Sequence, residues 1–161
     1  MSETEKLILA IRVRGQVRVS PQIEDTLDKL LLGRLHQARL LAVTSSLDGM
    51  ITKSKDYITW GEPNEEVVEK LLRKRGRLPA NGRLTDAYVK KNSSHSSIKA
   101  LAKAIVSGKG KVSDVEGLKP VFRLTPPTKG YGGKKRNLSV GMGGITGYRG
   151  EGINELAIRM I

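Results

Sequence analysis

The sequence LILAIRVR occupies residues 7–14, near the start of the chain. Its alternate positions form two sets, which are Leu7, Leu9, Ile11 and Val13 on one side and Ile8, Ala10, Arg12 and Arg14 on the other. Alternation with a period of two residues is typical of a β-strand. Because the second set ends in two cations, we expect the strand to point Arg12 and Arg14 outward.

A helix is predicted directly after this strand. Ser20 and Pro21 suit the cap and the first turn of a helix, and Gly33 suits its left-handed end. The residues between them include an apolar stripe with helical spacing, made of Ile23, Leu27, Leu30 and Leu31.

Two more strands and a second helix follow before residue 62. Residues 38–44 are short, apolar and β-branched, and residues 57–60 (YITW) combine aromatic and β-branched side chains, so both segments read as strands. Apolar residues within 47–57 fall near one face of a helix. The order β-α-β-α-β places both helices on one face of the sheet, so we expect residues 1–62 to form a compact two-layer α/β unit, an α+β sandwich.

Residues 63–124 read as a helical extension with a returning strand. Helices are predicted over 64–76, 85–92 and 97–107, and the first has Asn64 as its N-cap and Gly76 as its stop. Residues 118–124 read as a fourth strand. Pro120 cannot donate to a strand ladder, so we expect this strand at an edge of the sheet.

The end of the helix at 64–76 is strongly basic. Four of the five residues from 73 to 77 are cations, namely Arg73, Lys74, Arg75 and Arg77. Cations match the negative end of a helix dipole, and that is the alternative explanation. The density of charge exceeds this need, so we predict that these four side chains contact RNA.

The whole chain is a strong polycation. Its 161 residues carry 29 Lys and Arg against 16 Asp and Glu, a net charge of +13. Residues 1–62 are almost neutral, whereas the excess of cations lies in the remaining two thirds. This distribution predicts a folded core whose later parts face a polyanion. The alternative is a surface charge that serves solubility alone.

Residues 125–161 form a Gly-rich basic tail. Nine glycines lie between residues 128 and 152, together with Lys129, Lys134, Lys135, Arg136 and Arg149. We expect no packed core from this segment. An RNA groove would then order it, because its cations release the counterions that are condensed on the phosphates. The alternative is a disordered linker to a short amphipathic helix at 153–161.

The sequence gives no sign of a metal, cofactor or catalytic site. It has no cysteine, His36 and His95 lie far apart, and the glycines of 141–147 lack the G-x-G-x-x-G spacing. We therefore expect neither an enzyme nor a small-molecule substrate. No apolar run reaches the length of a membrane span, and residues 1–15 lack the pattern of a secretory signal, so we expect a cytoplasmic protein. Aromatic residues are only 4 % of the chain, which favours recognition of RNA shape and backbone over base stacking.

Five blocks in order resemble one known family. They are residues 48–62 (DGMITKSKDYITWGE), 71–78 (LLRKRGRL), 83–89 (RLTDAYV), 117–127 (GLKPVFRLTPP) and 147–150 (GYRG). Together they resemble the archaeal branch of the large-subunit ribosomal protein thirty family. The resemblance implies a ferredoxin-like core at 1–62, an extension at 63–124 with a further edge strand, and the tail at 125–161.

The resemblance also implies a function. It implies a structural constituent of the large ribosomal subunit that binds 23S-type rRNA and neighbouring ribosomal proteins, with 5S rRNA left open as a partner. By position it implies RNA contact from Arg14, Arg18, Arg34, His36 and Lys53, and we add Lys55 beside the last of these. An accessory subunit for RNA processing and a free-standing nucleic-acid-binding protein are the alternatives that the basic charge permits.

Overall fold

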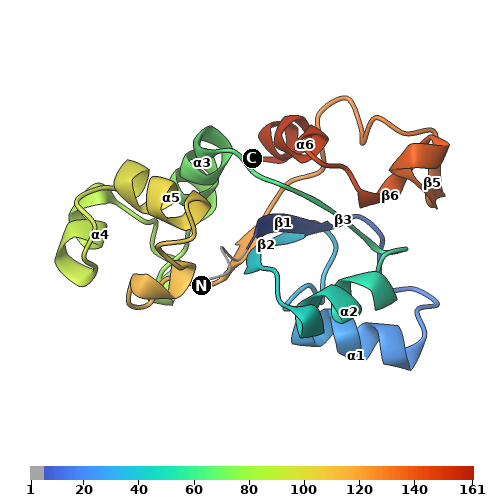
Figure 1. Cartoon of the computed structure of the whole chain (residues 1–161), viewed down its shortest axis with the longest axis horizontal. Coiled ribbons are helices and arrows are strands. Elements are labelled where there is room, and N and C mark those ends of the chain that lie inside the picture. The colour runs from blue at the N-terminus through green and yellow to red at the C-terminus, as the bar shows by residue number, and fades with distance from the viewer. Residues whose placement is uncertain (1–5) are drawn as a thin grey trace.

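The computed structural model describes residues 6–161, which form one six-stranded sheet with helices on both faces (Figure 1). The strand order is β4-β2-β1-β3-β6-β5. No helix in this described part of the chain has the length and apolar content to cross a membrane.

The predicted β-α-β-α-β unit is confirmed. It consists of β1 (Leu7–Arg12), α1 (Pro21–Lys29), β2 (Gln37–Ala42), α2 (Ser45–Lys53) and β3 (Ile58–Gly61). Strand β1 lies between β2 and β3 and is antiparallel to both. Helices α1 and α2 lie together on one side of the sheet (Figure 1), where Ile8 and Ala10 pack with Leu27, Ile51 and Ile58. The two layers expected for residues 1–62 follow from this packing.

One detail of α1 differs from the prediction. The helix ends at Lys29, and the residue with left-handed backbone is Leu31 (φ 58°), not Gly33. The chain turns two residues earlier than expected because Leu30 and Leu32 are both buried against the sheet.

The extension adds a third layer on the opposite face of the sheet. Its helices are α3 (Glu65–Arg75), α4 (Asp86–Asn92) and α5 (Ile98–Val106), and α6 (Gly152–Met160) of the tail joins them. Leu9 and Ile11 of β1 share one core with Leu71, Leu101 and Leu156 of this layer. Both faces of β1 are therefore buried.

The capping predictions for the extension hold. The Asn64 side chain accepts a hydrogen bond from the Val67 amide, and α3 ends at Arg75 with Gly76 as its C-cap. Strand β4 (Val121–Arg123) begins just after Pro120 and pairs with β2 at the edge of the sheet, as predicted.

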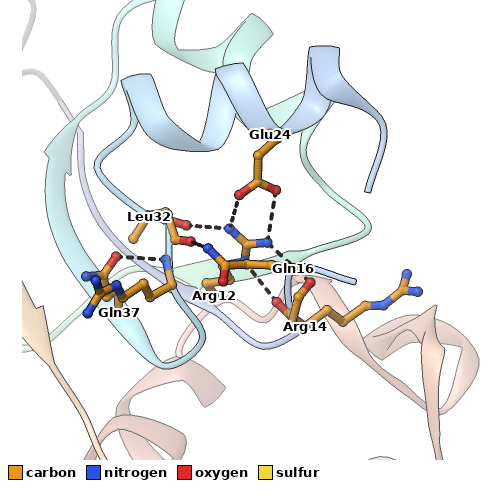
Figure 2. A network of polar contacts seen from close by, with 9 residues as sticks. Arg12, Arg14, Gln16, Glu24, Leu32 and Gln37 are labelled. Carbon is orange, nitrogen blue, oxygen red and sulfur yellow. Dashed lines mark hydrogen bonds and ion pairs between the residues drawn. The ribbon is translucent and has the colours of Figure 1, made fainter. Parts of the chain in front are cut away.

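The prediction that Arg12 points outward is wrong. Its side chain is completely buried between β1 and α1. Figure 2 shows the guanidinium group enclosed by Glu24 of α1 and by the loops that follow β1 and α1. A charge can occupy this place because its donors find carbonyl and carboxylate oxygens there.

The prediction that the Gly-rich segment supplies no packed residue is also wrong. This segment contains β5 (Lys135–Ser139) and β6 (Gly144–Tyr148), and β6 runs parallel to β3. Ile145 and Thr146 are buried. Glycine lets the backbones approach here, because a Cβ at Gly144 would collide with the carbonyl of Leu138.

This close approach gives a testable prediction. The substitution Gly144→Ala should lower the free energy of unfolding by about 1–3 kcal/mol, since the added methyl group has no room. Gly141→Ala is the matched control, because a Cβ there meets no atom within 4 Å. Urea denaturation of both variants checks the difference, and equal midpoints would contradict the packing of β6.

Candidate nucleic-acid interface

Three hollows are lined by residues of β2 and β4 and of the loops near β1, β2 and β4. The first, called here the basic hollow, has a volume of about 420 Å³. It is lined by Gln37, Arg75, Arg77, Asn81, Lys119, Val121 and Arg123. Arg75 is the last residue of α3 and Arg77 follows its C-cap, Gly76, whereas Lys119 precedes β4 and Arg123 ends it. Among the described residues, no carboxylate lines this hollow, so its field is positive.

The second hollow adjoins the first, and its residues Gln16 and Arg34 are the sequence neighbours of Gly15 and Leu35 in the third. It is lined by Gln16, Asp28, Leu31, Gly33, Arg34, Gln37 and Val121, and it shares Gln37 and Val121 with the basic hollow. The third, called here the aromatic hollow, has a volume of about 400 Å³. It is lined by Val13, Arg14, Gly15, Val17, Leu35, His36, Tyr57, Pro126, Tyr131 and Arg136. The three hollows together are called here the strip. It is rich in cations, and Asp28 is the carboxylate among its described lining residues.

Buried Arg12 holds the loops of this strip in place (Figure 2). Its guanidinium donates to the carbonyls of Arg14 (2.8 Å), Leu32 (2.9 Å) and Gly15 (3.2 Å), and to Glu24 at 3.4–3.5 Å.

Two amide side chains complete the network. The Gln16 amide donates to the carbonyl of Gly33, and Gln37 accepts from the Arg34 amide at 3.0 Å. The loops after β1 and after α1 are thus joined to each other and to α1.

Several predicted contact residues have partners inside the fold. Arg73 pairs with Glu69 and Asp86 at 3.3 and 3.4 Å. Arg75 donates to the carbonyl of Ile161 at 2.8 and 3.1 Å and so fastens the end of the chain.

Arg77 and Arg149 also donate within the fold. Arg77 donates to the carbonyls of Lys74 and Gly76, both at 3.2 Å, while still lining the basic hollow. Arg149 donates to Thr59 (2.9 Å) and to the carbonyl of Ile145 (3.0 Å), which ties β6 to β3. Burial lowers the pKa of Arg149 from its ordinary value. The donors of Arg149 that are used in this way are not available to phosphate.

Arg14 and His36 contact aromatic rings. The Arg14 guanidinium lies 4.8 Å from the centre of the Tyr57 ring, and it donates to the Asp56 carbonyl. His36 Nδ1 lies 3.1 Å from the Tyr131 hydroxyl, and the two rings are stacked. Sequence reasoning had placed both residues in the interface without these partners.

The remaining predicted residues are exposed. Within residues 6–161, no hydrogen bond or ion pair involves the side chains of Arg18, Arg34, Lys53, Lys55, Lys74, Lys129, Lys134, Lys135 and Arg136. Arg34 and Arg136 line the hollows, whereas Lys53 and Lys55 at the end of α2 do not. The structure therefore brings only part of the predicted set together.

Sequence reasoning missed two cations of the basic hollow, Lys119 and Arg123. The signal was present in the alternation of β4. Phe122 is buried, so the residues at 119, 121 and 123 share the opposite face, and all three line the hollow.

The titration of His36 gives a second prediction. Burial lowers the pKa of His36 below the ordinary value of about 6.5. The unfolded chain takes up this proton at higher pH than the folded chain does, so the free energy of unfolding should fall as the pH drops below about 6.5. Urea denaturation across this range checks it. A His36→Gln variant should lose the part of this pH dependence that His36 contributes. If the free energy of unfolding changes with pH equally in the two proteins, the prediction is contradicted.

No group of three or more His, Asp or Glu side chains that could bind a metal ion occurs in the described part of the chain.

Comparison with known proteins gives matches over the core and over the whole chain. Residues 8–58 match the family described as Ribosomal protein L30p/L7e. The chain is 48 % identical over 155 residues to large ribosomal subunit protein uL30 of Methanobrevibacter smithii, covering 96 % of this chain and 100 % of that protein. The protein of the same name from Methanosphaera stadtmanae is 48 % identical over 151 residues (94 % and 97 %), and that of Nanoarchaeum equitans is 46 % identical over 155 residues (96 % and 99 %).

Proposed function

Since this chain belongs to the ribosomal protein L30p/L7e family, we propose that the strip formed by the three hollows is the surface on which it binds large-subunit rRNA. The protein is a structural constituent of the large ribosomal subunit and is not an enzyme. In the large subunit it binds rRNA and neighbouring ribosomal proteins. We propose further that its RNA partner is 23S-type rRNA.

The observation that carries the proposal is the basic hollow. Arg75, Arg77, Lys119 and Arg123 converge there from two elements, and Asn81 adds a neutral amide group. A phosphodiester backbone that turns through this hollow would replace its condensed counterions with these cations. Strands of RNA that repel each other could then stay close together.

The exposed cations outside the hollows have a secondary place in the proposal. Lys74 directly precedes Arg75 of the basic hollow in sequence. Lys129, Lys134 and Lys135 belong to the exposed part of the Gly-rich segment. We assign them to phosphates that flank the strip. Arg18, Lys53 and Lys55 are assigned in the same way to RNA next to α1 and α2.

The experiment is a binding titration of the purified chain with 23S-type rRNA at increasing salt. The logarithm of the binding constant should fall with the logarithm of salt concentration with a slope at least as steep as about −3, since the four cations of the basic hollow alone contribute about −3 to −4 and the flanking cations add to it. Sedimentation of the tagged protein from cells should place it with large subunits. A slope near zero, or sedimentation with the nucleoid, would overturn the proposal.

The same titration with isolated 5S rRNA tests the second RNA partner. Equal slopes and affinities for the two RNAs would extend the proposal to 5S rRNA. Binding to 5S rRNA that is weaker at every salt concentration would restrict the proposal to 23S-type rRNA.

A further inference from the structure

We propose that the aromatic hollow receives one unpaired nucleobase of RNA, with Arg14 and Arg136 beside the phosphates of that nucleotide. This inference rests on the proposed rRNA-binding function and adds a contact of a different kind. Phosphate contacts position RNA without reading it, whereas a pocket for a base requires a nucleotide that is free of its helix.

The lining supplies aromatic surface from three separate segments. His36 precedes β2, Tyr57 precedes β3 and Tyr131 lies in the Gly-rich segment. The His36 and Tyr131 rings are stacked with 6.1 Å between their centres and 18° between their planes. Bases stack on aromatic rings of this kind in proteins that bind single-stranded RNA.

The charge around the hollow fits a nucleotide. Arg14 and Arg136 line it, and no carboxylate among the described residues does. The guanidinium of Arg14 already lies 4.8 Å from the centre of the Tyr57 ring, so a cation and an aromatic surface are held side by side. A nucleotide combines an apolar flat base with an anionic phosphate, and it could contact both.

The rim of the hollow exposes apolar side chains that the fold does not use. Val17 is 86 % exposed and Leu35 is 43 % exposed. They lie on the two loops that buried Arg12 and Gln16 fasten together. Both side chains add apolar surface to the lining of the hollow, against which the flat face of a base could pack. A fixed rim also lowers the entropy that binding would otherwise cost.

The backbone around Tyr131 directs this ring toward His36, which precedes β2. Gly130 and Gly132, on either side of it, have φ angles of 78° and 81°, which favour glycine. The turn that they form places the Tyr131 hydroxyl at His36, 95 residues away in sequence.

The test uses the full chain and a short single-stranded oligouridylate that carries one 2-aminopurine. The matched probe has an abasic sugar at that position. The wild-type protein should quench the fluorescence of 2-aminopurine and should bind the abasic probe on the order of tenfold more weakly, because one stacked base is lost. Equal affinity for the two probes would overturn the inference.

Two variants assign the base to this hollow. Tyr131→Ala and Val17→Ala should each remove most of the preference for the base, and both should keep the salt slope for 23S-type rRNA. Met142→Ala is the control, because Met142 is 70 % exposed and lies outside the hollow. Tyr131→Phe keeps the ring and should keep the preference, which covers the case that Tyr131→Ala fails to fold.

The outcomes separate this inference from the proposed function. If the preference for the base survives in Val17→Ala and in folded Tyr131→Ala, the base does not bind in this hollow. If the variants only lower incorporation into large subunits, and the two probes bind equally, a neighbouring protein covers the hollow instead. If the wild-type protein binds no RNA at all, the proposed function fails together with the inference.

Discussion

Replacing Arg12 with methionine is expected to lower the free energy of unfolding by about 3–5 kcal/mol, among the largest effects of any single substitution in this chain. The methionine fills much of the volume but donates nothing. The carbonyls of Arg14, Gly15 and Leu32 would lose their donor, and the bond to Leu32 is fully buried. An acceptor buried without a partner costs about 1–3 kcal/mol.

Two further variants show which contacts of Arg12 carry this energy. Glu24→Gln should cost less than about 1 kcal/mol, because the Glu24 side chain is 29 % exposed and its contacts with Arg12 are long. Arg39→Met, on the neighbouring strand, removes one bond to the carbonyl of Leu30 and should cost about 1 kcal/mol. Urea denaturation measures all three variants. A loss for Arg12→Met no larger than that for Arg39→Met would contradict the role given to the buried guanidinium.

Arg12 also marks where sequence reasoning stops. The alternation of residues 7–14 correctly predicts the strand, because strand geometry alone sets a period of two. The same pattern predicted an outward Arg12, since a charge is rarely fully buried. Three loop carbonyls and Glu24 surround the Arg12 guanidinium only once the chain has folded. No local sequence pattern predicts that these groups come together.

Glycine in the tail shows the same limit. Nine glycines between residues 128 and 152 predict a flexible segment on entropy alone. Gly144 is instead required where β6 approaches Leu138, and Ile145 beside it is buried. Ile145 is buried among helices and strands from other parts of the chain. The sequence of the tail alone therefore does not show that Ile145 stabilises the fold.

The sequence predicts the cations of the candidate interface where they follow one another along a single helix end. It does not predict them where separate segments of the chain bring them together. The run at 73–77 was recognisable as a basic cluster, yet Arg73 and Arg75 are engaged by Asp86 and by the carbonyl of Ile161. A linear count of charge cannot distinguish a cation that binds a neighbour from one that faces solvent. Lys119 and Arg123 are distant from this run in sequence. They join it through the pairing of β4 with β2 and through the hydrogen bond that the Lys119 amide donates to the Arg77 carbonyl at 2.9 Å.

Charge removal in the basic hollow is the second change with a large expected effect. The triple variant Arg77→Gln, Lys119→Gln, Arg123→Gln should weaken binding to 23S-type rRNA on the order of 100-fold near about 0.1 M salt, and it should make the salt slope shallower by about 2 to 3. Arg75 is left intact, because its bonds to the Ile161 carbonyl hold the chain end and its loss would confuse binding with stability. Filter binding across a salt series measures both quantities.

The control for this variant removes the same charge elsewhere. Lys90→Gln, Lys91→Gln, Lys103→Gln changes three exposed cations of α4 and α5 that line none of the three hollows. If net charge alone drives binding, the two triple variants will lose affinity equally, and the basic hollow has no special role. If the cations act through their convergence at one place, the control will keep nearly the full slope, because its lysines line none of the three hollows.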